Sequence, residues 1–350
     1  MIVLASSYLK IRFIKAQLIL GFLFLFISCS RNYNSYIISG NTMGTTYEVK
    51  LVFKHTNHEK IKIKNSIDSV LINLNQQMST WIKESEISLF NENLSTDPQK
   101  ISDDFFYVLE QGKIINQKTS GVFDYTIFPI MNLWGFGPTA NKEKKIPNKS
   151  AIEKVLRYVG VGNIQLNYPY IKKLHPKIQL DLNAIAKGYA VDKVHDWLAL
   201  KGFSNIYVEI GGEVRCSGVN ASNNKWLIGI DTPAENSFPG QKLFTNTKLN
   251  NKSLATSGNY RNFRSQNGKN INHTINPISG FPLETNVASV SVKADKCLTA
   301  DAWATALMVL SYEAGMKKVE EDETIEALWI VLDESGDFKQ YSSSSFLNRH

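Results

Sequence analysis

The sequence predicts an α+β protein in which helices pack on a mostly antiparallel sheet. Segments with helical apolar spacing and segments with strand-like alternation are mixed along the chain, and they lack the regular strand–helix alternation of a doubly wound parallel sheet. Neither an internal repeat nor a Pro/Gly-rich linker interrupts the chain after its N-terminal segment. The remaining length, about 320 residues, is enough for one large domain or two modest, intertwined ones.

The first half of the chain supplies one strand and three helices to this fold. Polar and apolar side chains alternate in the strand, whereas the helices carry apolar residues at intervals of three and four. The expected elements are a strand at 47–53, helices at 61–74 and 105–119, an exposed loop rich in Lys, Asn and Pro at 141–150, and a short helix at 151–159.

The second half supplies most of the sheet. A strand is expected to run directly into an amphipathic helix, and the next strand ends in Gly211-Gly212-Glu213. A further helix begins at Cys297, where Ala, Leu and Trp dominate. The expected elements are strands at 177–182, 205–210, 226–230, 288–292 and 326–332, and helices at 184–200 and 297–310.

The N-terminal segment has the composition of an export signal. Basic residues precede an apolar run at 18–27, which is too short to span a bilayer comfortably. The run leads into Ser28-Cys29, which resembles the lipobox of bacterial lipoproteins, where the cysteine is acylated and holds the protein at a membrane surface. An ordinary secretory signal with an incidental cysteine is the alternative. We predict a signal peptide at 1–28, a lipidated tether at 29–38, and a folded domain at 39–345 on the periplasmic side of the cell envelope.

Charge and cysteine content exclude several classes of function. The formal charge of +7 falls to +4 when Lys10, Arg12 and Lys15 leave with the signal. The rest of the chain has no dense Lys/Arg patch with interleaved aromatic residues, so a nucleic-acid partner is not expected. After Cys29 only Cys216 and Cys297 remain. Since neither lies in a CxxC or His/Cys metal pattern, a zinc site or a disulfide scaffold is not expected.

The helix that begins at Cys297 carries two oxygen donors on an otherwise apolar turn. Asp301 and Thr305 are four residues apart, so both side chains leave the same face of the helix. A carboxylate and a hydroxyl suit a hard cation such as Mg²⁺. Alternatively, Asp301 only caps or charges the helix N-terminus, and Thr305 bonds to a backbone carbonyl.

A second candidate site is the junction at 180–190, where the predicted strand is followed directly by the helix and small residues lie between them. The start of a helix favours an anionic phosphate, and Lys187 in the first turn can reach a pyrophosphate oxygen. The alternative is that residues 181–183 form a capping turn and that Lys187 is solvated.

Other segments combine stacking surfaces or polar groups with turns. Met43 precedes Gly44, and a methionine side chain packs well on an aromatic ring. Trp81 and Phe123 place aromatic faces at loop edges, although such rings commonly belong to the core or rim. His273 lies beside a Pro/Gly turn. An imidazole is suited to proton transfer near neutral pH, although a single loop histidine is usually a surface or structural residue.

In their order and spacing these segments resemble the ApbE family of FAD:protein FMN transferases. The resemblance extends from about Ser39 to Leu332, nearly the whole chain after the signal. The motifs that carry it are Met43-Gly44-Thr45-Thr46-Tyr47, Met78-Ser79-Thr80-Trp81, Phe123-Asp124, Leu133-Trp134-Gly135-Phe136-Gly137, residues 181–188, Glu209-Ile210-Gly211-Gly212-Glu213, Ser257-Gly258-Asn259-Tyr260, residues 273–277, and Thr299-Ala300-Asp301-Ala302 with Thr305.

This resemblance implies an ApbE-like, T-fold-related architecture that binds FAD as substrate with Mg²⁺ at the pyrophosphate. His273 then matches the base that deprotonates a Thr or Ser hydroxyl, which attacks the FMN-side phosphorus and releases AMP. The implied acceptors resemble subunits of sodium-pumping quinone reductase or related electron-transfer complexes. The implied FAD contacts are Met43, Trp81, Val122, Phe123, Asp124, Asp181, Lys187 and Ile275, and the implied metal ligands are Asp301, Thr305 and the backbone carbonyl of Ala184.

Three residues depart from the family pattern, and two other functions share the same residues. Trp81 stands where Tyr is common, Asn183 where Gly or Ser is common, and Asn276 where Asp is common. Asn276 could therefore orient the imidazole only as an amide.

The alternative functions are hydrolysis of FAD to FMN and AMP, and FAD binding by a lipoprotein without catalysis. Retention of both His273 and the Asp301/Thr305 pair argues against a non-catalytic binder, because a pure binder has less need of a base.

Overall fold

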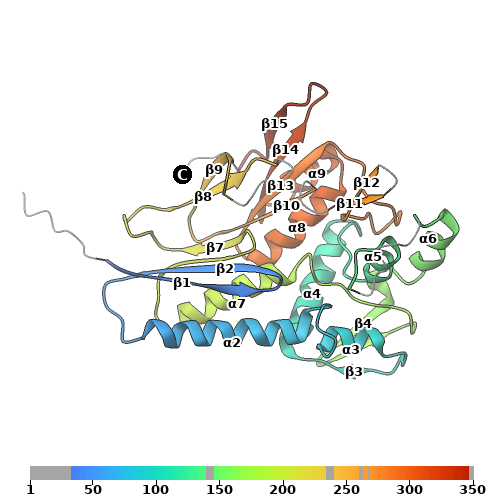
Figure 1. The fold of residues 1–350 in the computed structure, drawn as a ribbon, viewed down its shortest axis with the longest axis horizontal. Coiled ribbons are helices and arrows are strands. Elements are labelled where there is room, and N and C mark those ends of the chain that lie inside the picture. The colour runs from blue at the N-terminus through green and yellow to red at the C-terminus, as the bar shows by residue number, and fades with distance from the viewer. Residues whose placement is uncertain (1–32, 139–145, 234–239, 260–262, 267–268, 347–350) are drawn as a thin grey trace, which may run out of the picture. The chain divides into compact units, whose positions relative to one another are not determined.

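An eight-stranded sheet forms the centre of the molecule (Figure 1). It is seen in a computed structural model that describes residues 33–138, 146–233, 240–259, 263–266 and 269–346. The strand order is β1-β2-β6-β7-β10-β13-β14-β15, and all ladders from β2 to β15 are antiparallel. The strands are β1 (Asn34–Thr42), β2 (Thr45–Phe53), β6 (Asn205–Ile210), β7 (Glu213–Ser217), β10 (Ser253–Gly258), β13 (Val287–Ala294), β14 (Ile325–Leu332) and β15 (Phe338–Ser342).

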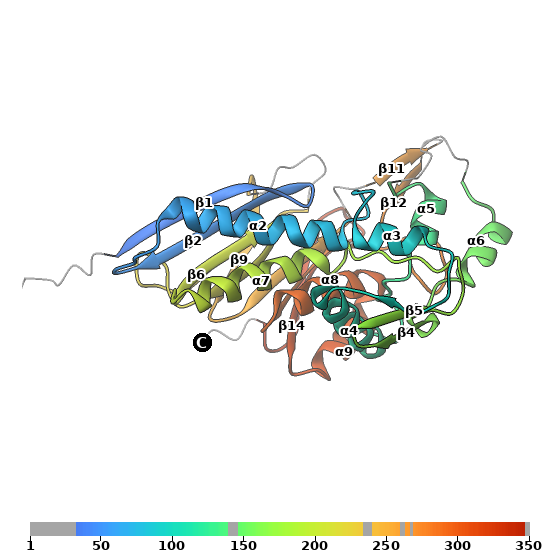
Figure 2. The same ribbon diagram turned by 90° about the horizontal axis from the view of Figure 1, so that it is seen from below.

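Helices α7 and α8 pack on this sheet and on each other. α7 contacts β6 and β7, and α8 contacts β10 and β13. α2 packs on α7, and the two helices run side by side in the view from below (Figure 2). The predicted α+β class is therefore confirmed. The helices are α2 (Lys60–Met78), α3 (Glu86–Glu92), α4 (Asp103–Lys118), α5 (Phe128–Trp134), α6 (Lys149–Leu156), α7 (Ala186–Leu200), α8 (Cys297–Val309) and α9 (Tyr312–Glu320).

Three small sheets complete the described part of the fold. Two of them are hairpins, and the third joins β3 and β4 through β5. The strands are β3 (Gln99–Lys100), β4 (Ile164–Asn167), β5 (Tyr170–Lys173), β8 (Trp226–Asp231), β9 (Leu243–Leu249), β11 (Phe263–Gln266) and β12 (Lys269–Asn272), with one 3₁₀ turn at Val161–Asn163.

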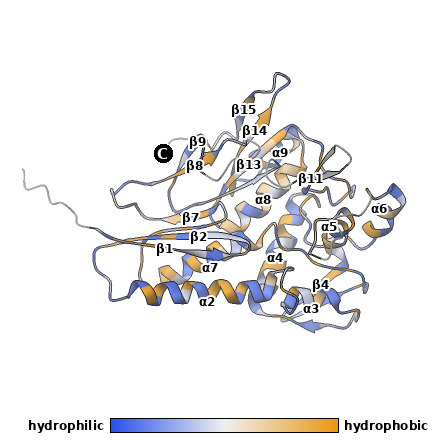
Figure 3. Ribbon diagram, in the orientation of Figure 1, coloured by the Kyte–Doolittle hydropathy of each residue, from blue (hydrophilic) through white to orange (hydrophobic). Residues whose placement is uncertain are grey.

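The apolar patterns explain why the main helices lie where they do. In α2 the side chains of Ile63, Ile67, Leu71 and Leu74 recur at helical spacing, and all are buried. Helix α8 differs, because nearly all of its residues are buried and its sequence is largely apolar (Figure 3). A helix that is apolar all round belongs inside a protein, so a charged residue on α8 requires a particular reason.

One predicted strand is absent. Residues 177–182 are not part of a sheet, and α7 begins at Ala186 after a turn. The backbone of this segment bonds elsewhere: the Leu180 amide donates to Asn91 Oδ1 at 2.6 Å, and its carbonyl accepts from Asn91 Nδ2 at 2.8 Å. The Asp181 amide donates to the Tyr125 carbonyl at 2.8 Å. The alternating apolar residues made the segment look like a strand, but its polar groups are satisfied by a side chain and a loop.

Among the described residues, the folded domain begins with strand β1. β1 begins at Asn34 and buries Ile38, so it includes the last residues of the segment predicted to be a tether. The described residues from Ser35 onward belong to one compact unit. None of the helices in the described ranges has both the length and the apolar character needed to cross a membrane.

Candidate active site

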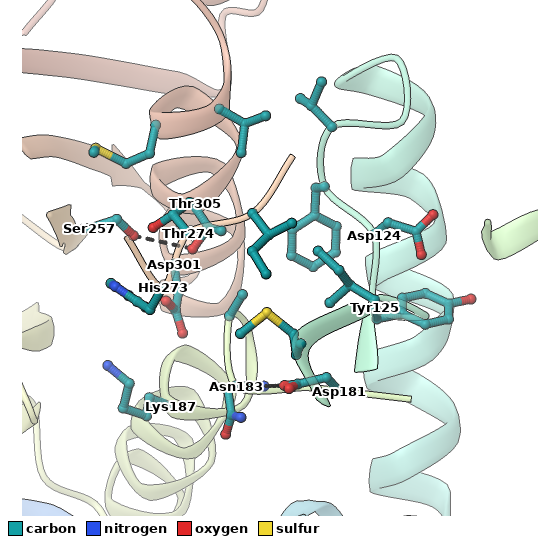
Figure 4. A pocket seen from close by; sticks show the side chains of 18 of the residues that line it. Asp124, Tyr125, Asp181, Asn183, Lys187, Ser257, His273, Thr274, Asp301 and Thr305 are labelled. Atoms are coloured by element: carbon teal, nitrogen blue, oxygen red, sulfur yellow. Dashed lines mark hydrogen bonds between the residues drawn. The ribbon is translucent and has the colours of Figure 1, made fainter. Parts of the chain in front are cut away.

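A cavity of about 310 Å³ lies where the start of α7, helix α8 and the ends of β7 and β10 meet (Figure 4). This is the volume range of small-molecule sites. Ten residues that the sequence predicted for the site line this one cavity, although they come from distant parts of the chain. They are Val122, Phe123, Asp124, Asp181, Ala184, Lys187, His273, Ile275, Asp301 and Thr305.

Two predicted FAD contacts, Met43 and Trp81, are not among the described residues that line the cavity. Met43 lies in the turn between β1 and β2 with a φ of 48°. Trp81 lies in the turn after α2 and is 67% exposed. In the same turn, Ser85 Oγ donates to the Ser79 carbonyl at 2.7 Å. Cys29 lies outside the described residues.

Helix α8 places Asp301 and Thr305 on the cavity wall one turn apart. Asp301 is 4% exposed, and its Oδ2 accepts a hydrogen bond from the Gly188 amide at 2.9 Å. Burial raises the pKa of this carboxyl, against the opposing effect of the nearby Lys187. Thr305 Oγ1 lies 3.2 Å from Ser257 Oγ, which comes from the end of β10. A buried carboxylate with one protein donor is costly unless something else pairs with it.

Gly188 lets α7 approach α8 closely enough to form this pair. A Cβ at position 188 would lie 2.4 Å from the Cys297 carbonyl oxygen and 2.8 Å from Asp301 Cβ. Any side chain would therefore push the two helices apart. The same crossing holds Asp301 beside the start of α7, where Lys187 in the first turn and Ala184 in the turn before the helix both line the cavity.

Asp192, one turn further along α7, fixes the start of α8. Its two carboxylate oxygens accept hydrogen bonds from the Cys297 amide at 2.9 Å and from the Leu298 amide at 3.0 Å. Arg215 donates to the same carboxylate at 2.8 Å. Because a carboxylate at a helix N-terminus satisfies open amides and complements the helix dipole, Asp192 sets the position from which Asp301 projects.

Lys187 and Glu213 form an ion pair in the cavity wall. Lys187 Nζ donates to Glu213 Oε1 at 2.7 Å, and the Glu213 side chain is 4% exposed. Burial lowers the pKa of the Lys187 ammonium, but the carboxylates of Glu213 and Asp301 outweigh burial and raise it. The pKa of Glu213 is raised by burial, with Lys187 opposing. Sequence reasoning did not select Glu213 as a site residue, although a carboxylate directly after two glycines at a strand end was a usable signal.

The other two carboxylates of the lining are held by the protein. Asp124 Oδ1 accepts from the Thr126 amide at 2.7 Å, and its Oδ2 accepts from the Val161 amide at 3.2 Å. Asp181 Oδ1 accepts from the Asn183 amide at 2.8 Å. Burial raises the pKa of both carboxyls. Both side chains therefore shape the loops of the wall as well as adding negative charge to it.

His273 lines the cavity on a short segment between β12 and a turn. Ile275 in the same segment bridges to Pro282. Asn276 closes the following turn, because its Oδ1 accepts from the Ile278 amide at 2.9 Å and from the Ser279 amide at 3.2 Å. The amide oxygen of Asn276 is thus used by the turn.

The donor set tests whether a metal would fit. The described residues hold no group of three or more His, Cys, Asp or Glu side chains able to bind a metal. Asp301, Thr305 and the carbonyl of Ala184 offer only oxygen, which suits Mg²⁺ or Ca²⁺ rather than zinc. Apart from His273, the acidic and basic side chains of the described lining are four carboxylates and one lysine. The residues therefore fit a hard divalent cation whose coordination is completed by a ligand or water.

Comparison with known proteins gives consistent matches. A model of the ApbE family matches residues 43–329. The FAD:protein FMN transferase of Vibrio cholerae serotype O1 is 36% identical over 93% of this chain and 96% of that protein. The enzyme of the same name from Haemophilus influenzae is 34% identical over 91% of this chain and 92% of its own.

Solved structures agree with the sequence matches. The flavin transferase ApbE from Vibrio cholerae superposes with a TM-score of 0.81 at 36% identity, covering 90% of this chain and 99% of that one. The apo form of the Pseudomonas stutzeri flavinyl transferase ApbE superposes with a TM-score of 0.79 at 31% identity, covering 90% and 96%. Both the resemblance and the fold expected from it are thereby confirmed.

Proposed function

The chain belongs to the ApbE family, and from this premise we propose how its cavity transfers FMN from FAD to an acceptor protein. The enzyme class follows from curated relatives named FAD:protein FMN transferase. The proposal concerns the chemistry: a Thr or Ser hydroxyl attacks the FMN-side phosphorus, the pyrophosphate bond breaks, and AMP leaves. FMN then remains joined to the acceptor through a phosphoester.

One observation carries this mechanism: an imidazole, a hard-cation donor set and a partly buried ammonium line the same cavity. In this proposal His273 accepts the proton of the attacking hydroxyl, and its position in the cavity lining and the basicity of imidazole near neutral pH support that role. Lys187, in the first turn of α7, contacts the pyrophosphate oxygens.

The charge of the cavity supports the involvement of Mg²⁺. Glu213 already neutralises Lys187, and Asp301 adds a further buried negative charge. A pyrophosphate would therefore enter a wall whose described carboxylates outnumber its lysine. Asp301, Thr305 and the Ala184 carbonyl would hold Mg²⁺ there. When bound, the ion supplies charge neutralisation at the pyrophosphate and on the departing AMP.

Transfer is tested by following the flavin. We incubate the purified protein with FAD, Mg²⁺ and candidate acceptors that resemble subunits of sodium-pumping quinone reductase or related electron-transfer complexes. Mass spectrometry should find FMN on an acceptor Thr or Ser, with one AMP released per adduct. FMN and AMP appearing without an adduct would identify a pyrophosphatase, and unchanged FAD would identify a non-catalytic binder.

The site of action is a second part of this proposal. Cys29 follows an apolar run that ends in a small residue, and this pattern supports a lipid anchor on the periplasmic side of the envelope. Replacing Cys29 by alanine should move the protein from the membrane fraction to the soluble fraction and remove incorporation of a labelled fatty acid. Asn32→Ala, in the same segment, is the matched control and should stay in the membrane fraction. A Cys29→Ala protein that still sediments with membranes would contradict the anchor.

A further inference from the structure

Glu213 has a position that the proposed chemistry leaves unexplained. It is the first residue of β7 and follows Gly211 and Gly212, whose φ angles of 62° and 105° suit glycine. This turn directs the side chain into the cavity instead of into solvent, where a charged residue beside a hairpin turn usually lies. Glu213 is 3% exposed and lines the cavity.

Only one oxygen of this carboxylate is used by the described protein. Oε1 accepts from Lys187 Nζ at 2.7 Å, whereas the buried Oε2 has no hydrogen-bond partner among the described residues. Buried polar atoms almost always have partners, and an exception calls for an explanation. Because an ionised carboxylate only accepts hydrogen bonds, the missing partner has to be a donor.

The position of Lys187 narrows the choice of donor. If Lys187 contacts the pyrophosphate of FAD, as proposed above, Oε2 lies beside the groups that flank that pyrophosphate. The phosphate oxygens carry negative charge and cannot donate. On both sides of the pyrophosphate FAD carries sugar hydroxyls, from the ribityl chain on the FMN half and from the ribose on the AMP half, and hydroxyls can donate.

We propose that Glu213 is a specificity-determining residue that recognises a sugar hydroxyl of FAD through Oε2 while holding Lys187 through Oε1. This inference rests on the proposed function, because it takes FAD as the ligand. One carboxylate thereby links recognition of the sugar to the position of the ammonium beside the phosphates. A ligand without that hydroxyl leaves Oε2 unpaired in the cavity wall.

The test compares ligands in one protein and then repeats the comparison in a variant. FAD, a ribityl-deoxy FAD and a 2′-deoxyribose FAD are titrated by flavin fluorescence against the wild-type protein and against Glu213→Gln. Wild type should bind one deoxy analogue at least about tenfold more weakly than FAD, as expected for a lost hydrogen bond to a charged group. In Glu213→Gln this difference should fall to within about twofold. The analogue that is discriminated identifies which sugar is recognised.

Glu209→Gln is the matched control. Glu209 lies at the other end of the same turn, where its Oε1 accepts from the Gly212 amide at 2.6 Å, and it does not line the cavity. This variant should keep the wild-type ratio of affinities, even if its thermal stability changes. If Glu213→Gln does not fold, Glu213→Asp replaces it in the test. This variant keeps the charge but is one methylene shorter, and it should likewise lose the preference for FAD over the deoxy analogue.

Two results would overturn the inference: equal affinity of wild type for FAD and both analogues, or an unchanged ratio in the Glu213 variants. Because the readout is binding, it is independent of catalysis. Transfer of FMN by wild type is measured in parallel. Discrimination without transfer would refute the proposed function alone, and transfer without discrimination would refute the role of Glu213 alone.

Discussion

Replacement of His273 by alanine should reduce FMN transfer by about 10²–10⁴-fold and leave FAD affinity within about tenfold of wild type, or about 1.4 kcal/mol. In the proposed mechanism the imidazole takes the proton of the attacking hydroxyl, whereas the substitution leaves Lys187 and the proposed cation ligands in place. Transfer is measured as FMN bound to an acceptor peptide by mass spectrometry, and FAD affinity is measured by fluorescence titration.

Two variants make this result interpretable. His273→Gln keeps a polar side chain but cannot accept a proton at neutral pH, so it should be as inactive as His273→Ala. His55→Ala removes an exposed histidine on the loop after β2 and should transfer FMN at the wild-type rate. Wild-type transfer by His273→Ala would exclude this residue as the base. A parallel loss of FAD affinity and transfer would assign it to binding instead.

Asp301→Asn should abolish the dependence of transfer on Mg²⁺ together with most of the activity. Lewis-acid and charge-neutralising effects contribute several kcal/mol to such reactions, so we expect a loss of at least about 100-fold in rate. Asparagine still accepts the hydrogen bond that the Gly188 amide donates to Asp301 Oδ2, so the crossing of α7 and α8 is preserved. EDTA should inactivate the wild-type enzyme, and added Mg²⁺ should restore it.

Asp295→Asn is the control for removal of a carboxylate near the same helix. Its side chain is 83% exposed and pairs with Lys252 at 2.9 Å, a surface contact worth little, so the rate and its Mg²⁺ dependence should not change. Thr305→Val, which removes a hydroxyl at nearly constant volume, should weaken Mg²⁺ dependence as Asp301→Asn does. Wild-type activity that is indifferent to EDTA would contradict the metal site.

Much of the fold could be predicted because burial leaves a clear pattern in the sequence. The apolar spacing of α2 and the alternation in β2 each mark one buried face. β1 was missed because it is a mostly exposed edge strand with only Ile38 buried. The prediction of a strand at 177–182 was wrong, because apolar alternation does not show which groups accept and donate the backbone hydrogen bonds. Here the backbone of Leu180 bonds to the side chain of Asn91 instead of to another strand.

The site was harder to predict than the fold, since periodicity does not show which distant segments meet. Asp301 on an apolar helix could be selected from its own neighbours. Glu213 was not selected, although it directly follows two glycines at a strand end, because its pairing with Lys187 becomes visible only when the turn between β6 and β7 is folded. Trp81 is 67% exposed, so its burial does not mark it as a site residue, and its contact with FAD stays a prediction.

The close crossing at Gly188 also couples the affinity of the enzyme for its ligands to the stability of its fold. Asp301 meets the Gly188 amide across 113 residues of sequence, and Asp192 meets Cys297 across 105. An unfolded chain does not hold these groups together, so a ligand of the cavity binds the native state. By mass action a ligand at 100 times its Kd then adds about 2.7 kcal/mol to the free energy of unfolding. The resistance of the protein to heat should therefore rise with the concentration of FAD.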